Sequence, residues 1–118
     1  MPVLDEKLLE QLLELIGGDK PTLNNLIETF LEEGMEIVSD MKSALQDKNI
    51  DVLRRGAHSL KSSAQDFGAT SLSELNATLE SHCKNGWPDN ATEQTAAISD
   101  SFDESVLELR QYMGRNIL

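Results

Sequence analysis

A histidine near the middle of the chain is surrounded, at helical spacing, by residues that can handle an anion. Around a helix axis with about 100° between successive residues, five side chains fall within roughly 60° of His58: Arg54, Arg55, Lys61, Ser62 and Gln65. The chain carries 21 acidic residues. None lies between Val52 and Gln65, where about two or three would be expected. We therefore predict chemistry on an anion, and a phosphoryl group is the anion that we favour.

The residue types around this histidine fit phosphoryl transfer in particular. An unperturbed imidazole titrates near pH 6.5, so its neutral, nucleophilic form is available near neutral pH. A migrating phosphoryl group keeps negative charge on its equatorial oxygens, so positioning and positive charge favour its transfer. Lys61, one turn further on, and Arg54 and Arg55, one turn before, can supply that charge. Ser62 and Gln65 can donate hydrogen bonds.

The same residues also allow a simpler interpretation. A single histidine on a helix surface is most often only solvated, and surface arginines and lysines most often serve solubility. The acid-free window and the shared helix face favour the functional interpretation. Spacing alone does not separate the two.

Length, charge and cysteine content limit the class of protein. A chain of 118 residues suits one domain, residues 1–118, which buries roughly two thirds of its unfolded surface. Its one cysteine, Cys83, has no internal disulfide partner, and the N-terminal segment is amphipathic rather than a signal sequence, so we expect a cytoplasmic protein. No apolar run approaches the roughly 20 residues that span a bilayer. The formal net charge of −11 disfavours nucleic acid and anionic membrane as partners.

Apolar residues recur at helical spacing, and the period-two alternation of strands is missing. Five helical segments are expected, at about 5–16, 20–46, 49–69, 72 to between 84 and 86, and from a possible capping box at 90–93 to about 114. The first has a broad apolar face: Leu8, Leu9, Leu12, Leu15 and Ile16. Short connections imply antiparallel neighbours. We predict an all-α fold, an antiparallel up-down-up-down four-helix bundle whose short first helix covers one end.

Local signals set the expected helix boundaries. Asp19 can cap the second helix, and the run from Ser71 to Glu74 reads as a capping box that starts the fourth helix at Leu72. Gly68 offers a left-handed residue after the third helix. Gly34, in the middle of the second helix, costs about 1 kcal/mol relative to alanine and so indicates a close helix approach.

Other chemistries lack matching residues. His82 and Cys83 have no second ligand pair nearby, so no metal site is expected, and Cys83 should be a small core hydrophobe. Neither histidine has glutamate three residues before it, as a di-metal bundle needs. No glycine-rich phosphate loop supports ATP binding. We therefore expect no cofactor and no metal.

The stretch from His58 to Ala64, followed by Phe67-Gly68-Ala69, resembles the signature of histidine-containing phosphotransfer (HPt) domains of two-component phosphorelays. Further family-like positions are Phe30-Leu31, Ala44-Leu45, Asp47 and Leu79-Glu80. The resemblance implies that His58 is phosphorylated on Nε2 and that Lys61 helps to hold the phosphoryl group. Phe67 and Gly68 then have structural roles. Ser62 stands where many members have glycine. Serine is slightly larger than glycine at this position of the docking surface.

The resemblance also implies partners. A receiver domain, phosphorylated on aspartate and carrying its own Mg2+, would donate the phosphoryl group, and a second receiver aspartate would take it. A hybrid sensor kinase would stand upstream. The chain itself would be a monomeric phosphocarrier without ATP-dependent kinase activity. The alternative is a helical adaptor that binds signalling partners without phosphorylation. The sequence does not identify the kinase and the receiver, the pathway or the direction of phosphoryl flow. It also does not indicate whether the chain is free-standing.

Overall fold

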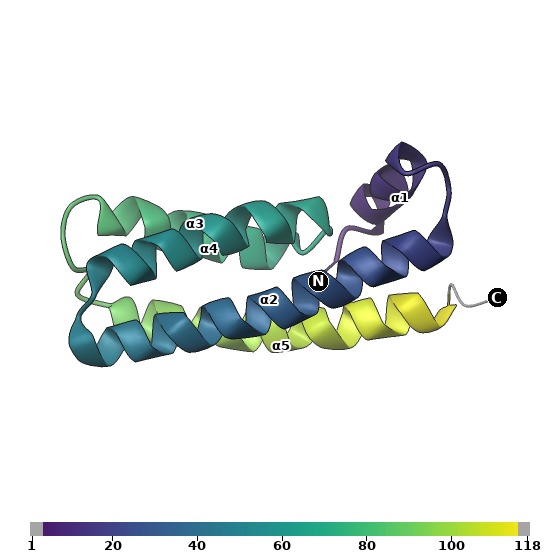
Figure 1. Ribbon diagram of the computed structural model, residues 1–118. Helices are drawn as coiled ribbons and strands as arrows, with labels where there is room; N and C mark the ends of the chain where they lie inside the picture. The colour runs from purple at the N-terminus through teal and green to yellow at the C-terminus, as the bar shows by residue number, and fades with distance from the viewer. Residues whose placement is uncertain (1–3, 116–118) are drawn as a thin grey trace.

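The computed structural model describes residues 4–115, which form helices and no strand. In chain order these are α1 (Glu6–Leu15), α2 (Lys20–Asp47), α3 (Ile50–Asp66), α4 (Thr70–Cys83) and α5 (Ala91–Arg115). The long helices α2 and α5 run side by side along the molecule, and the shorter pair α3 and α4 lies along part of their length (Figure 1). The predicted all-α, antiparallel four-helix bundle is confirmed.

The order of the four long helices around the bundle follows from their contacts. α3 packs on α2 and α4, and α5 packs on the same two helices from the other side. Among the described residues no Cα atom of α3 lies within 8 Å of one in α5, so these two helices lie diagonally across the bundle. The α3–α4 pair and the α2–α5 pair are therefore opposite sides of the molecule, which measures 47 × 25 × 19 Å.

The short helix α1 covers one end of the bundle, as predicted, and rests on α2 and α3 (Figure 1). Its attachment depends on Gly68, which follows α3 with a left-handed φ of +79°. The backbone N–H of Asp5 donates to the Gly68 carbonyl at 2.7 Å, and a Cβ on Gly68 would lie 2.5 Å from the Asp5 carbonyl oxygen. One expectation for this helix is wrong. Leu15 is 83% exposed, and Leu13 packs against the core instead.

Two other helix ends differ from the prediction. α3 ends at Asp66 rather than near residue 69, because Phe67 and the left-handed Gly68 turn the chain. α4 begins at Thr70, with Ala69 at its N-cap and no side-chain cap, so the capping box predicted at 71–74 is wrong. The N–H of Ala69 instead donates to the Ala64 carbonyl at 2.9 Å. Because of this tight turn, α4 begins before Ser71.

Three further expectations are confirmed. Asp19 caps α2 by accepting from the N–H of Thr22 at 3.3 Å. Gly34 marks a close approach, since the Phe102 ring of α5 occupies the place of a Cβ. Cys83 is a core residue, with 4% of its surface exposed. Burial raises the pKa of the Cys83 thiol.

Candidate functional site

The predicted histidine lies on the outer face of α3, and its side chain is 60% exposed. The core stripe of α3 consists of other residues, Leu53, Ala57, Leu60 and Ala64, which are all buried. The ring Nδ1 of His58 lies 2.6 Å from Oε2 of Glu80, on α4. With Nδ1 engaged and the ring largely open to water, Nε2 is the nitrogen that a visiting molecule can reach.

Lys61 joins the same cluster from one turn further along α3. Its Nζ donates to Oε1 of Glu80 at 2.6 Å, so one carboxylate bridges the lysine and the histidine. Lys61 is 34% exposed and Glu80 only 13%. The hydrogen bond from Lys61, followed by the smaller one from His58, holds the pKa of the Glu80 carboxyl below its usual value, although burial acts in the opposite direction. Glu80 is therefore ionised at neutral pH.

The α3–α4 turn sets the register that brings these side chains together. The turn spans only residues 67–69, and Ser73 of α4 donates its hydroxyl to the Lys61 carbonyl at 2.8 Å. Ser73 is 7% exposed, so this bond ties the two helices together beneath the surface. Glu80, about two helical turns after Ser73, reaches the face that carries Lys61 and His58.

The other predicted site residues take up different positions around the histidine. Arg54 is half-buried on the α4 side, where its positive charge partly offsets the raised pKa of Cys83. Arg55 is exposed, and its Nε donates to the Asp51 carbonyl at 3.3 Å. Ser62 and Gln65 are exposed one and two turns along α3. Of the predicted set, Lys61 is the one residue that hydrogen bonds among the described residues connect to the histidine, and they do so through Glu80.

Phe67 and Gly68 lie at the C-terminal end of α3 and contact other elements of the fold. Phe67 is half-buried at the end of α3, and its ring stacks on Phe30 with 4.9 Å between centroids. Gly68 makes the turn and accepts the hydrogen bond that secures α1. Both residues place α3 rather than contact the histidine.

Glu80 is the member of the hydrogen-bonded cluster that the spacing of residues along α3 does not predict. An acid-free stretch of sequence does not make an acid-free surface, because the neighbouring helix contributes its own side chains. The sequence carries a weaker signal for this residue, since Leu79-Glu80 is one of the family-like positions.

Among residues 4–115, no group of three or more His, Cys, Asp or Glu side chains could hold a metal ion. The second histidine, His82, is engaged elsewhere, with its Nδ1 2.9 Å from Nε2 of Gln94. No helix in this part of the chain is long and apolar enough to cross a membrane.

Comparison of this chain with known protein families and structures agrees with the fold and with the α3 motif. The family model described as Hpt domain matches residues 25–113, which include α3, α4 and nearly all of α2 and α5. The chain belongs to the Hpt domain family. The predicted family is thereby confirmed.

Relatives of this Hpt domain are found among curated proteins and solved structures. The chain is 29% identical over 105 residues to the phosphorelay protein LuxU of Vibrio vulnificus, in strains YJ016 and CMCP6, covering 89% of this chain and 90% of LuxU. It is also similar to the crystal structure of histidine-containing phosphotransfer protein B (HptB) of Pseudomonas aeruginosa PAO1. That match has a TM-score of 0.88 and 25% identity, and it covers 97% of this chain and 96% of HptB.

Proposed function

We propose that this Hpt domain is a phosphorelay intermediate that accepts a phosphoryl group from a receiver aspartate onto Nε2 of His58 and passes it to a second receiver aspartate. The observation that carries the proposal is the bond between His58 Nδ1 and Glu80 at 2.6 Å, on a ring that is 60% exposed. It holds one nitrogen of the ring and leaves the other facing outward. The similarity to a phosphorelay protein supports the same function.

The carboxylate selects the reactive form of the ring. An ionised carboxylate only accepts hydrogen bonds, and the pKa of Glu80 is lowered. Nδ1 of His58 must therefore carry the hydrogen in this contact, which leaves the lone pair on Nε2. A neutral imidazole in this tautomer is a nucleophile whose lone pair points into solvent.

Transfer to His58 and transfer from His58 each consist of one in-line displacement at phosphorus. The Nε2 lone pair attacks the phosphorus of the receiver's aspartyl phosphate, an N–P bond forms, and the P–O bond to aspartate breaks to release a carboxylate. The phosphorylated ring keeps its Nδ1 hydrogen and gains positive charge. Glu80 stabilises that charge through the bond it already makes. A second receiver aspartate reverses the sequence, with its carboxylate as the nucleophile.

The neighbouring side chains can assist the incoming phosphoryl group. The ammonium of Lys61 is held one turn away, partly exposed, and can move towards the equatorial oxygens of the phosphoryl group. Arg54 adds positive charge from the α4 side, and Ser62 and Gln65 offer hydrogen bonds at the exposed surface. The small side chain of Ser62 also lets a receiver surface come close to Nε2.

The partners that we propose follow from this chemistry. The upstream donor is a receiver domain associated with a hybrid sensor kinase, and Mg2+ belongs to that receiver. We also propose that residues 1–118 form one domain that acts as a cytoplasmic monomer without ATP-dependent kinase activity. The net charge of −11 favours partners with basic docking surfaces.

The direct test is transfer from a 32P-labelled receiver to the wild-type chain and to His58→Gln. The wild type should gain acid-labile label, and His58→Gln should fold normally but gain none, because the amide of glutamine is not a nucleophile for phosphorus. The matched control is His82→Gln, which removes the other histidine and should label as the wild type does.

Two results would contradict the proposal. Label on His58→Gln would place the phosphoryl group elsewhere. A wild-type chain that binds its receiver but takes no label from it, at any receiver concentration, would instead favour the adaptor function.

A further inference from the structure

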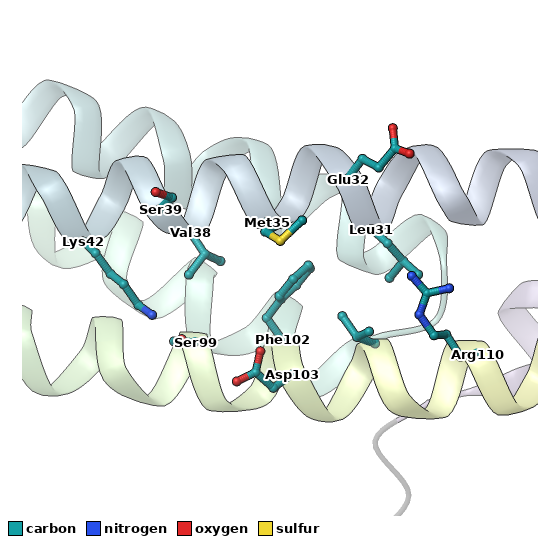
Figure 2. A pocket seen from close by; sticks show the side chains of 11 residues that line it. Leu31, Glu32, Met35, Val38, Ser39, Lys42, Ser99, Phe102, Asp103 and Arg110 are labelled. Carbon is teal, nitrogen blue, oxygen red and sulfur yellow. The ribbon is translucent and has the colours of Figure 1, made fainter.

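A groove lies between α2 and α5, on the side of the bundle opposite the α3–α4 pair (Figure 2). Its volume is about 410 Å3. The floor is apolar and is made by Leu31 and Val38 of α2 and Phe102 and Val106 of α5. The phosphotransfer proposed above makes no use of it.

Met35 gives the groove an apolar edge that is open to solvent. Its side chain projects from α2 above the Phe102 ring (Figure 2), and 63% of Met35 is exposed. Methionine is flexible and polarisable, which suits an adaptable contact. The neighbouring floor residues Leu31 and Phe102 are buried, so Met35 extends the apolar floor to the surface.

The two edges of the groove are mainly acidic. Glu32 and Asp103 line it directly, and Glu36 and Asp100 lie one turn away on the same helices, where both are exposed. Lys42 is a basic residue among the lining side chains. A second one, Arg110, is already paired, since its Nη1 lies 3.0 Å from Oε1 of Glu28. The unpaired charge along the edges is therefore predominantly negative.

We propose that this groove is a docking site for a cationic amphipathic helix of a partner protein. The lining from Leu31 to Lys42 spans about 16 Å of α2, which matches about three turns of a docked helix. Apolar residues at i, i+3, i+4 and i+7 would lie over the floor, and lysines or arginines beside them would face the acidic edges. Charge excludes the other occupants. A second copy of this acidic chain would bring like charges together, and an anionic membrane would be repelled.

The probe is a fluorescein-labelled helical peptide of roughly 14 residues, with leucine at i, i+3, i+4, i+7, i+8 and i+11 and lysine elsewhere. Its binding is followed by fluorescence polarisation at physiological salt. Two variants replace an exposed apolar residue by lysine and change the net charge equally: Met35→Lys in the groove and Leu15→Lys on α1, where Leu15 is 83% exposed. Circular dichroism checks that both fold.

We expect Met35→Lys to weaken binding at least tenfold and Leu15→Lys to leave it unchanged. Amide shifts caused by the peptide should fall on residues 28–42 and 99–110. The same peptide with glutamate in place of lysine should not bind, and phosphoryl transfer to His58 should be normal in Met35→Lys.

The proposal is overturned if the lysine peptide does not bind, if both variants bind it equally, or if the shifts centre on the α3–α4 side. It is also overturned if the glutamate peptide binds as well as the lysine peptide. A dimer seen by sedimentation that Met35→Lys abolishes would assign the groove to a second copy. None of these results depends on whether His58 is phosphorylated.

Discussion

The two sides of this bundle are built differently. On the α3–α4 side, His58, Lys61 and Glu80 are joined by two hydrogen bonds of 2.6 Å near the surface. On the α2–α5 side, the Phe102 ring fills the space that a side chain at residue 34 would take, and Phe102 is 5% exposed. The first side holds a few polar atoms in fixed geometry, and the second joins two long helices by close packing.

This difference predicts that the polar cluster and the Gly34–Phe102 contact respond differently to substitution. A polar cluster near the surface contributes little to folding, because water can replace each hydrogen bond that is lost. A buried close contact has no such replacement, and a change of one methyl group there is felt by the neighbouring helix. Substitutions on the two sides should therefore have opposite profiles, one in transfer rate and the other in unfolding free energy.

The largest expected effect is on transfer, in Glu80→Ala. Without the carboxylate, the His58 ring is free to rotate and to carry its hydrogen on Nε2, which removes the nucleophilic lone pair from the exposed position. We expect transfer from a phosphorylated receiver to slow by about 100-fold, or roughly 2.7 kcal/mol in activation free energy. The unfolding free energy should fall by less than about 1 kcal/mol. Rapid-quench labelling and urea denaturation measure the two quantities.

Two further variants sharpen this result. Lys61→Ala keeps the bond between His58 and Glu80, so its transfer should slow by only about tenfold. Glu74→Ala removes an exposed carboxylate from the same helix α4 and should transfer at the wild-type rate. Equal rates in Glu80→Ala and Glu74→Ala would show that the carboxylate does not position the ring.

The sequence predicted the two sides unequally well. Helix number and topology followed from apolar spacing, which buried residues such as Leu53, Leu60 and Ile98 satisfy. The close approach of α2 and α5 at Gly34 could be expected, because a glycine inside a helix needs a reason. Its partner, Phe102, could not be named, because spacing within one helix does not give the register between two helices.

The candidate site shows the same limit. His58 and Lys61 lie on one face of one helix, so their spacing could be read directly. Glu80 belongs to another helix, and its contact with both depends on where α4 begins. The start of α4 was predicted two residues too late, because the turn is closed by backbone bonds of Gly68 and Ala69 rather than by the expected capping box. A geometry that depends on inter-helix register was beyond the reach of residue spacing.

The second expected effect is on stability, in Gly34→Ala. A Cβ at this position collides with the Phe102 ring, which is buried and also contacts Phe30 edge-on at 6.2 Å between centroids. Overpacking of this kind costs about 1–3 kcal/mol, whereas the gain in helix propensity is about 1 kcal/mol. We expect a net loss of up to about 2 kcal/mol in unfolding free energy, measured by urea denaturation, with transfer by the folded protein unchanged.

Gly114→Ala is the matched control for that experiment. Gly114 is also in a helix, but a Cβ there would meet nothing within 4 Å, so the gain in helix propensity is unopposed and the substitution should raise the unfolding free energy by up to about 1 kcal/mol. If Gly34→Ala were as stable as Gly114→Ala, the α2–α5 contact would have room to adjust. The contrast between the two sides of the bundle would then be lost.

The smallest expected effect is the contribution of Glu80 to stability, and pH reveals it. The pKa of Glu80 is lower in the folded chain than its ordinary value of 4.5, so the unfolded chain takes up the proton first as the pH falls. The stabilisation is therefore complete above about pH 4.5 and disappears as the pH drops through the lowered folded value. We expect a full size of about 0.5–1 kcal/mol, because Lys61 and His58 are partly exposed.

The measurement compares the unfolding free energies of the wild type and Glu80→Gln from pH 7 downwards. Their difference should be constant near neutral pH and shrink only below the ordinary pKa of the carboxyl, because glutamine does not titrate. Because the unfolding free energies of the two chains are compared at the same pH, the contribution of the other acidic residues cancels. A difference that is already zero at pH 7 would mean that the cluster serves phosphoryl transfer without stabilising the fold. A difference that persists at the lowest pH would mean that it comes from packing of the side chain, and the ionic account of the α3–α4 side would be wrong.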